Sequence, residues 1–225
     1  MDIIKAIASE LNVRNNQVEA AVKLIDEGCT IPFISRYRKE ATGALNDEQL
    51  RNLDERLKYL RNLEDKKAQV IASIAEQGLL TDELKNQIEK ADTMVAVEDL
   101  YRPYRPKRRT RATIAKEKGL EPLANIIMLQ MTGEPVVKTA EEYVSEEKDV
   151  KTPEDAVAGA KDIIAESISD NADYRTRIRE LTFKEGVLTS AAKDAEAKTV
   201  YEMYYNFSEP AAKMAGHRIL AVNRG

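Results

Sequence analysis

The sequence of 225 residues has little of what disulfides, metal sites and phosphate-binding loops require. It contains one cysteine (Cys29), one histidine (His217) and no tryptophan. A lone cysteine excludes an intrachain disulfide framework, and no pair of histidines or CxxC motif is present to hold a metal. We therefore expect no bound metal and a reducing, cytoplasmic environment.

Glycine is also scarce, and the nine glycines are scattered along the chain. They form neither a GxGxxG turn nor a GxxxxGKS/T loop, the two glycine patterns that cradle phosphates. Cys29 has no histidine near it in the sequence, which favours a structural role over a nucleophilic one. Adjacent acids such as Glu146 and Glu147 fit a solvated surface better than a general acid–base pair. We expect no catalytic residue, no cofactor and no enzymatic activity.

Long apolar runs are absent as well, since none approaches the roughly 20 residues that a membrane span needs. Met1 is followed by an acidic residue and an amphipathic pattern, which is not typical of a signal peptide. Alanine, leucine, lysine and glutamate are abundant, and this composition favours helix over sheet. The sequence predicts a soluble, all-α, multi-helical protein without a membrane segment.

The first 45 residues predict three short helices with tight connections, because apolar positions recur there at helical spacing. Ala8, Asn12 and Val18 have the spacing of a helix-turn-helix motif. The second helix, which Asn15 or Asn16 can cap, carries Lys23 against three acidic residues (Glu19, Asp26 and Glu27). A helix in the major groove lies near phosphates, so this charge favours a packed three-helix unit over DNA reading.

Residues 46–186 predict a long spine helix and several shorter ones. Asn46 and Gln49 form a capping box, and the spine covers about 46–77, roughly 48 Å. Its leucine heptad fails at Glu64 and Lys67. Beyond residue 186 the helical period fades, so 187–225 is expected to be an irregular segment leading into a missing downstream domain. We expect the chain to be a fragment.

One stretch concentrates positive charge. Six of the eleven residues from Tyr101 to Arg111 are basic and none is acidic, whereas the remaining chain has 29 basic against 39 acidic residues. Two prolines fix the backbone and make an exposed, semi-rigid loop between helices. Arginines grip phosphates and tyrosines offer stacking faces, so single-stranded nucleic acid is one ligand. Pairing within the protein and contact with a protein partner such as RNA polymerase remain alternatives.

The candidate nucleic-acid-binding residues in this basic tract are Tyr101, Arg102, Tyr104, Arg105, Lys107, Arg108, Arg109 and Arg111. A secondary, weaker basic cluster consists of Arg36, Arg38 and Lys39.

Two segments also resemble a known family. EDLYRPYRPKRRTRATIAKEKGLEPLA (98–124) and IPFISRYRKEATGALNDEQL (31–50) resemble signatures of the Tex family of bacterial transcription accessory proteins. The spine and the end SEP…HRILAVNRG match in order and spacing, so the resemblance covers essentially the whole chain. It implies an all-α N-terminal region with a helix-turn-helix-like portion. It also implies further domains downstream: an RNase H-like domain, a helix-hairpin-helix domain and an RNA-binding OB-fold.

The sequence thus favours a non-enzymatic helical module of a transcription accessory protein that binds RNA or single-stranded DNA weakly through the basic tract. The alternative function is a protein-docking scaffold that contacts the transcription machinery, with the tract serving assembly. Downstream domains of the same protein are further expected partners. No catalytic residue is carried over from the family.

Overall fold

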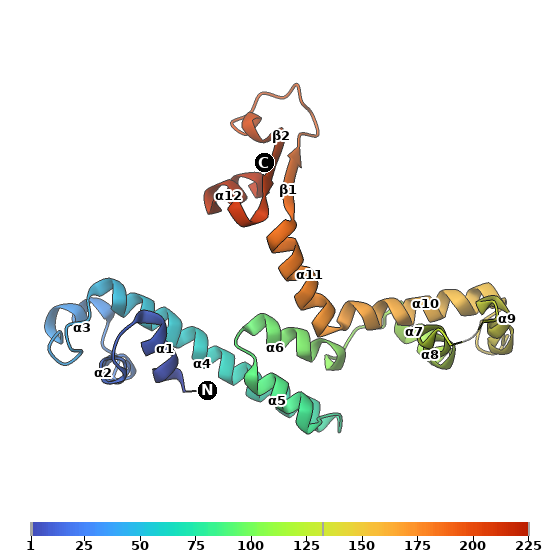
Figure 1. The fold of residues 1–225 in the computed structure, drawn as a ribbon, viewed down its shortest axis with the longest axis horizontal. Helices are drawn as coiled ribbons and strands as arrows, with labels where there is room; N and C mark the ends of the chain where they lie inside the picture. The colour runs from blue at the N-terminus through green and yellow to red at the C-terminus, as the bar shows by residue number, and fades with distance from the viewer. Residues whose placement is uncertain (1, 132, 225) are drawn as a thin grey trace. The chain divides into compact units, whose positions relative to one another are not determined.

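A computed structural model of the chain describes residues 2–131 and 133–224, and its fold is mostly α-helical (Figure 1). The predicted fold class is thereby confirmed, with one small two-stranded sheet in addition. The chain divides into two compact units, Met1–Tyr104 and Arg105–Gly225. The domain boundaries after residues 45 and 186 stay predictions. No helix in the described ranges is long and apolar enough to cross a membrane.

The described residues of the first unit, 2–104, form six α-helices, of which α4 is the longest. In Figure 1 the first three helices lie beside one part of α4, while the last two lie beside its other part. The helices are α1 (Ile3–Leu11), α2 (Asn15–Asp26), α3 (Ile31–Tyr37), α4 (Asp47–Glu76), α5 (Asp82–Lys90) and α6 (Met94–Tyr101).

Helix α4 is the predicted spine, and its start is confirmed. The Asn46 side chain accepts from the Gln49 backbone N–H at 2.8 Å, and the Gln49 side chain accepts from the Asn46 backbone N–H at 3.0 Å. The buried stripe runs on through Lys67, where the heptad was expected to fail. Lys67 Nζ donates to Glu64 Oε1 and to the Glu89 carbonyl, both at 2.9 Å. These two bonds satisfy a charge that burial would otherwise destabilise.

The three N-terminal helices share their core with the spine. Ile7 of α1, Val18 of α2 and Ile34 of α3 are fully buried in one cluster with the leucines of α4. Asn12, at the predicted turn after α1, adopts a left-handed φ of 53°. Helix α2 begins at Asn15 itself, so neither predicted asparagine is its cap. The three-helix order is as expected, and the helix-turn-helix assignment stays a prediction.

The second unit contains the remaining elements, with α7, α8 and α9 packed along α10. Its helices and strands are α7 (Arg111–Glu117), α8 (Glu121–Leu129), α9 (Val136–Ala140), α10 (Pro153–Asp170), α11 (Ala172–Glu185), β1 (Val187–Ala191), β2 (Asn206–Pro210) and α12 (Gly216–Arg224).

Small residues fill the core between α7 and α10. Ala112 and Ala115 of α7 meet Ala156 and Ala160 of α10, and all four are at most 3% exposed. A Cβ atom at Gly159 would overlap the end of the Leu120 side chain, so a larger residue there would require Leu120 to shift. Leu120 and Leu123, at most 1% exposed, complete this core beside the alanines.

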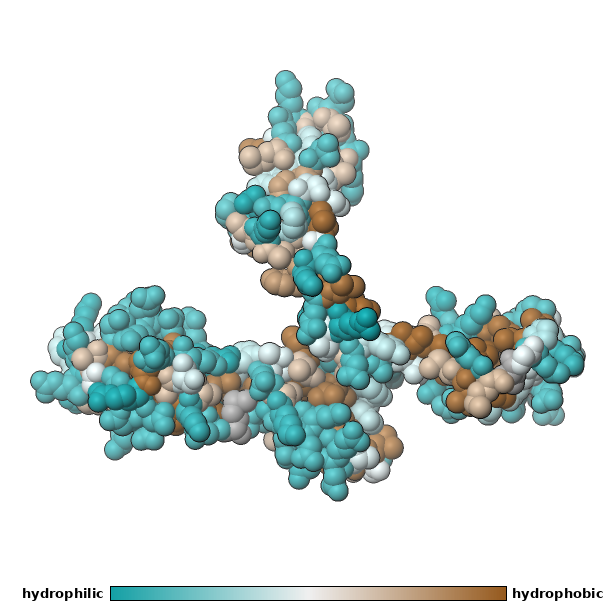
Figure 2. All heavy atoms as spheres, in the orientation of Figure 1, coloured by the Kyte–Doolittle hydropathy of each residue, from teal (hydrophilic) through white to brown (hydrophobic). Residues whose placement is uncertain are grey.

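The segment 187–225, predicted to be irregular, contains regular structure. Strands β1 and β2 pair antiparallel, with Val187 opposite Pro210 and Ala191 opposite Asn206, and α12 follows. The helix before the sheet, α11, has no buried residue in the described structure. Its Ile178 is 62% exposed and its Leu181 is 52% exposed, and Figure 2 shows brown, apolar surface in this part of the chain.

Candidate nucleic-acid interface

The basic tract is a connection between two helices. Helix α6 ends at Tyr101, a single 3₁₀ turn covers Arg102–Tyr104, and residues 105–110 run without regular structure to the start of α7. Thr110 caps α7, because its Oγ1 accepts from the Thr113 backbone N–H at 3.0 Å. The cations of the tract therefore lie on a short segment that helices fix at both ends.

The two tyrosines of the tract lie in the first unit and pack against its core. The Tyr101 hydroxyl is 3.0 Å from Ser73 Oγ, and Lys66 Nζ lies 5.9 Å from the centroid of its ring. Tyr104 is half-buried against the same core. Both rings therefore stabilise α6 and its end, and their exposed area for stacking is small.

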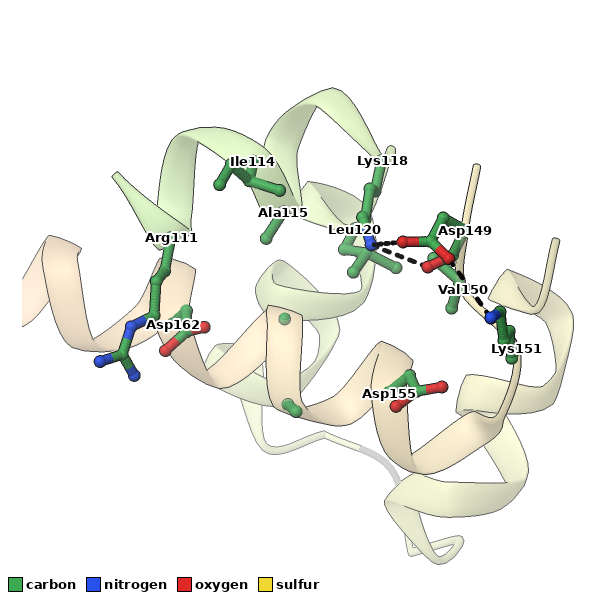
Figure 3. Close-up of a pocket in the computed structure, with 12 residues that line it drawn as sticks. Arg111, Ile114, Ala115, Lys118, Leu120, Asp149, Val150, Lys151, Asp155 and Asp162 are labelled. Carbon is green, nitrogen blue, oxygen red and sulfur yellow. Dashed lines mark hydrogen bonds and ion pairs between the residues drawn. The ribbon is translucent and has the colours of Figure 1, made fainter. Parts of the chain in front are cut away.

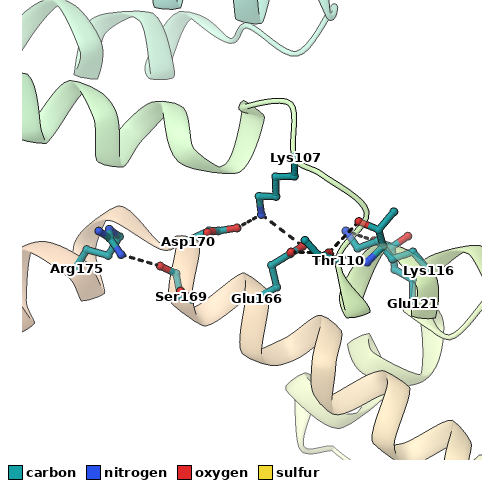
Figure 4. Close-up of polar contacts among 9 residues, drawn as sticks. Lys107, Thr110, Lys116, Glu121, Glu166, Ser169, Asp170 and Arg175 are labelled. Atoms are coloured by element: carbon teal, nitrogen blue, oxygen red, sulfur yellow. Dashed lines mark hydrogen bonds and ion pairs between the residues drawn. The ribbon is translucent and has the colours of Figure 1, made fainter.

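Lys107 is tied to helix α10 (Figure 4). Its Nζ forms an ion pair with Asp170 and lies 3.4 Å from Glu166 Oε2. Thr110 donates a hydrogen bond to Glu166 Oε1 at 3.0 Å, which attaches the same segment a second time. Because the Asp170 side chain is only 9% exposed, Lys107 balances a largely buried charge. Lys107 is thus a structural residue of the second unit.

The arginines of the tract differ in how far they are engaged. Arg109 Nη2 donates to Glu117 Oε2 at 2.8 Å, and both side chains are more than half exposed. Arg102 and Arg105 are exposed and each takes part in an interaction within the chain. The side chains of Arg108 and Arg111 are exposed and form no hydrogen bond or ion pair with the described residues.

Arg111 also lines a cleft of about 430 Å³ between α7 and α10 (Figure 3). Asp162 lies at the same end of this cleft, and Lys118, Asp149 and Lys151 lie at the other. A hydrogen bond from Lys118, and then the charges of Lys118 and Lys151, hold the pKa of Asp149 below its usual range. The cleft is therefore lined by balanced charge, and its walls do not favour a strongly anionic ligand.

The secondary cluster lies at the end of α3. Arg36, Arg38 and Lys39 are exposed and line a hollow of about 570 Å³, together with Tyr37 and one acidic residue, Glu40. The aromatic residues of this cluster were not predicted from the sequence. Phe33 and Tyr37 are 39% and 68% exposed, and their ring centroids lie 5.4 Å apart. Their spacing of four residues in a short helix was the signal that could have identified them.

The described ranges contain no cluster of side chains suited to a metal ion. No three His, Cys, Asp or Glu side chains there come close enough to hold a metal ion. Cys29 is half-buried beside the first core, and His217 is exposed on α12. These features define a class of protein, a helical scaffold with exposed cationic surfaces.

Comparison with known proteins gives the family. Residues 1–75 match the family described as Tex-like protein N-terminal domain, and residues 132–225 match the one described as Tex central region-like. The chain is 50% identical over 97% of its length to YdcI of Bacillus subtilis. It is 43% identical over its whole length to the transcriptional accessory protein Tex of Neisseria gonorrhoeae. The chain belongs to the Tex family.

More distant relatives share the same region. The chain is 28% identical, over its whole length, to the human S1 RNA-binding domain-containing protein 1, of which it covers 23%. It spans about a third of the length of its bacterial relatives, 31% of YdcI and 30% of the gonococcal Tex protein.

Proposed function

We propose that this chain is a non-enzymatic helical module of a transcription accessory protein that contacts single-stranded nucleic acid through the second half of the basic tract. The observation that supports the proposal is that three exposed arginines of the tract have no ion pair or only a weak one. Arg108 and Arg111 form no ion pair within the described residues, and Arg109 has only an exposed pair with Glu117. Exposed pairs contribute little stability, so Arg109 can exchange its carboxylate for a phosphate.

The relatives support the same ligand class. One bears the name transcriptional accessory protein, and another is named for an S1 RNA-binding domain. Transcription places such proteins near single-stranded RNA and DNA. The net charge of −4 opposes binding to any polyanion, so only a local cationic surface can carry the contact.

The expected affinity is low and depends on salt. Three arginines that each neutralise one phosphate give a log–log salt slope of about −2, since each contact on a single strand contributes about −0.7. The dissociation constant is expected on the order of 10⁻⁴ to 10⁻⁶ M at physiological salt, the range of non-specific binding.

A titration against single-stranded RNA at several salt concentrations tests this proposal. The variant with Arg108→Ala, Arg109→Ala and Arg111→Ala is expected to lose most of the slope. The matched control carries Lys193→Ala, Lys198→Ala and Lys213→Ala, three exposed lysines of the same unit. It has the same net charge as the first variant and is expected to keep the slope. Equal slopes in the two variants would contradict the proposal.

Two other outcomes would indicate a different function. If all these changes leave RNA affinity unaltered while the arginine variant no longer binds purified RNA polymerase, the tract is a protein-docking segment. If the purified chain cleaves RNA and a single substitution abolishes the cleavage, the module is an enzyme.

A further inference from the structure

The surface at the end of α3 combines two exposed rings with three cations. The rings of Phe33 and Tyr37 face each other at an angle of 44°, and the Arg38 guanidinium carbon lies 5.6 Å from the Phe33 ring centroid. Arg36 and Lys39 lie beside them, and no side chain of the three cations is paired with an acid among the described residues. We define Phe33, Arg36, Tyr37, Arg38 and Lys39 as the α3 surface.

These side chains point outward because the rest of the segment is anchored. Ile34, on the opposite side of the short helix, is fully buried in the first core. Thr42 is also fully buried, and its Oγ1 donates to the Lys39 carbonyl at 3.2 Å. Phe33 is 39% exposed and Tyr37 is 68% exposed, so most of the Tyr37 side chain lies outside this anchoring. The core therefore does not account for Tyr37.

The turn after α3 is held in one conformation by backbone bonds. The Ala44 N–H donates to the Lys39 carbonyl at 2.8 Å, and the Gln17 side chain donates to the Gly43 carbonyl at 2.7 Å. Gly43 and Ala44 both adopt left-handed φ values, of 61° and 65°. None of these bonds uses the side chain of a cation. The turn is thus a rigid support from which the cations are free to bind a ligand.

We propose that the α3 surface is a second binding site for single-stranded nucleic acid, in which a base stacks on Tyr37 and the flanking phosphates contact Arg36, Arg38 and Lys39. Every base has a π-face, so an exposed ring binds single strands with little regard to sequence. Arginine contributes to such sites through its planar, weakly hydrated cation. The proposal shares its ligand class with the proposed function but concerns a different surface and a different contact, the base rather than the phosphate alone.

The absence of tryptophan makes a direct test possible. The Tyr37→Trp variant carries a single tryptophan, whose fluorescence a stacked base quenches. We expect quenching by an oligothymidylate of about 12 nucleotides, and none by an abasic chain of the same length. The control is Leu79→Trp, at a 52% exposed position three residues from both Glu76 and Asp82, where no quenching is expected.

The affinity measurement uses the same two oligomers. We expect Tyr37→Ala to weaken binding of the oligothymidylate roughly fivefold or more, the loss of one stack, and Tyr37→Phe to leave it unchanged. Binding of the abasic chain is expected to be equal in all three proteins. The arginine variant of the tract should show a smaller salt dependence, because only Arg36, Arg38 and Lys39 still contact phosphates, but should keep the preference for the chain with bases. This difference separates the two proposals.

Three results would overturn the proposal. They are equal quenching in the Tyr37→Trp and Leu79→Trp proteins, equal affinity of the wild type for the two oligomers, and unaltered affinity in Tyr37→Ala. In case a substitution disturbs the fold, cross-linking of the wild-type chain to a photoreactive oligothymidylate gives an independent result. Mapping of the cross-link outside residues 31–44 would contradict the site.

Discussion

The basic tract and the α3 surface differ in whether their cations are paired with acidic side chains. The tract has six cations, but Lys107 is paired with Asp170 and Glu166, and Arg109 is paired with Glu117. The α3 surface has three cations, and none has an acidic partner among the described residues. The density of positive charge along a sequence therefore overstates the charge that is available to a ligand.

The difference has a physical origin in what surrounds each segment. The tract lacks regular backbone bonds over residues 105–110, and the side chains of Lys107 and Thr110 attach it to α10 instead. The turn after α3 is fixed by its own backbone and by Gln17. Side-chain cations are thus used for structure where the backbone bonds are few, and are left exposed where they are many.

The sharpest contrast is between the tyrosines of the two surfaces. Tyr101→Ala is expected to lower the free energy of unfolding of the first unit by about 2–4 kcal/mol, because a half-buried ring leaves the core. Tyr37→Ala is expected to change it by less than about 0.5 kcal/mol, as for other exposed sites. Chemical denaturation of both variants measures the difference. Equal destabilisation would show that Tyr37 is a core residue and unavailable to a base.

Lys107 and Arg108 of the tract should also differ in how much they contribute to the free energy of unfolding. Lys107→Ala removes a cation beside the largely buried carboxylate of Asp170, so we expect a loss of about 1–3 kcal/mol in the second unit. Arg108→Ala is expected to cost less than about 0.5 kcal/mol. Hydrogen exchange at the backbone amides of α7 and α10 reports on this unit alone. A result in which both variants exchange like the wild type would remove the structural role of Lys107.

The features that could be predicted from the sequence are those that depend on interactions between residues close together in the chain. The spine and its capping box were predictable, because the bonds of Asn46 and Gln49 join residues three apart. The partner of Lys107 was not, since Asp170 lies 63 residues away. The hairpin of β1 and β2 was missed for a similar reason. Each strand has only five residues, and both are exposed and half-buried in alternation, so neither carries an apolar run.

The ion pair between Lys67 and Glu64 should also make the free energy of unfolding depend on pH. A hydrogen bond from Lys67 holds the pKa of Glu64 below its usual value of 4.5. Because the pKa is lower in the folded state, the pair stabilises the first unit above about pH 4.5 and loses this effect as the pH falls through the lowered pKa. Urea denaturation between about pH 6 and pH 3 should show the loss. The pair-deficient variant Lys67→Met should show a shallower dependence, and an identical dependence in both proteins would contradict the assignment.

The smallest of the expected effects is sequence-specific binding of duplex DNA by the three-helix unit. Helix α2 carries Glu19 and Asp26 against Lys23, and Arg61 of the spine is paired with Asp26 at 2.7 Å, so α2 offers no excess of positive charge. A recognition helix in the major groove has phosphates on both sides and needs such an excess. Selection from a random pool of duplexes is therefore expected to return no enriched sequence. An enriched site that is lost in the Lys23→Ala variant would show that the three-helix unit reads DNA. Helix α2 would then be a nucleic-acid contact besides the basic tract and the α3 surface.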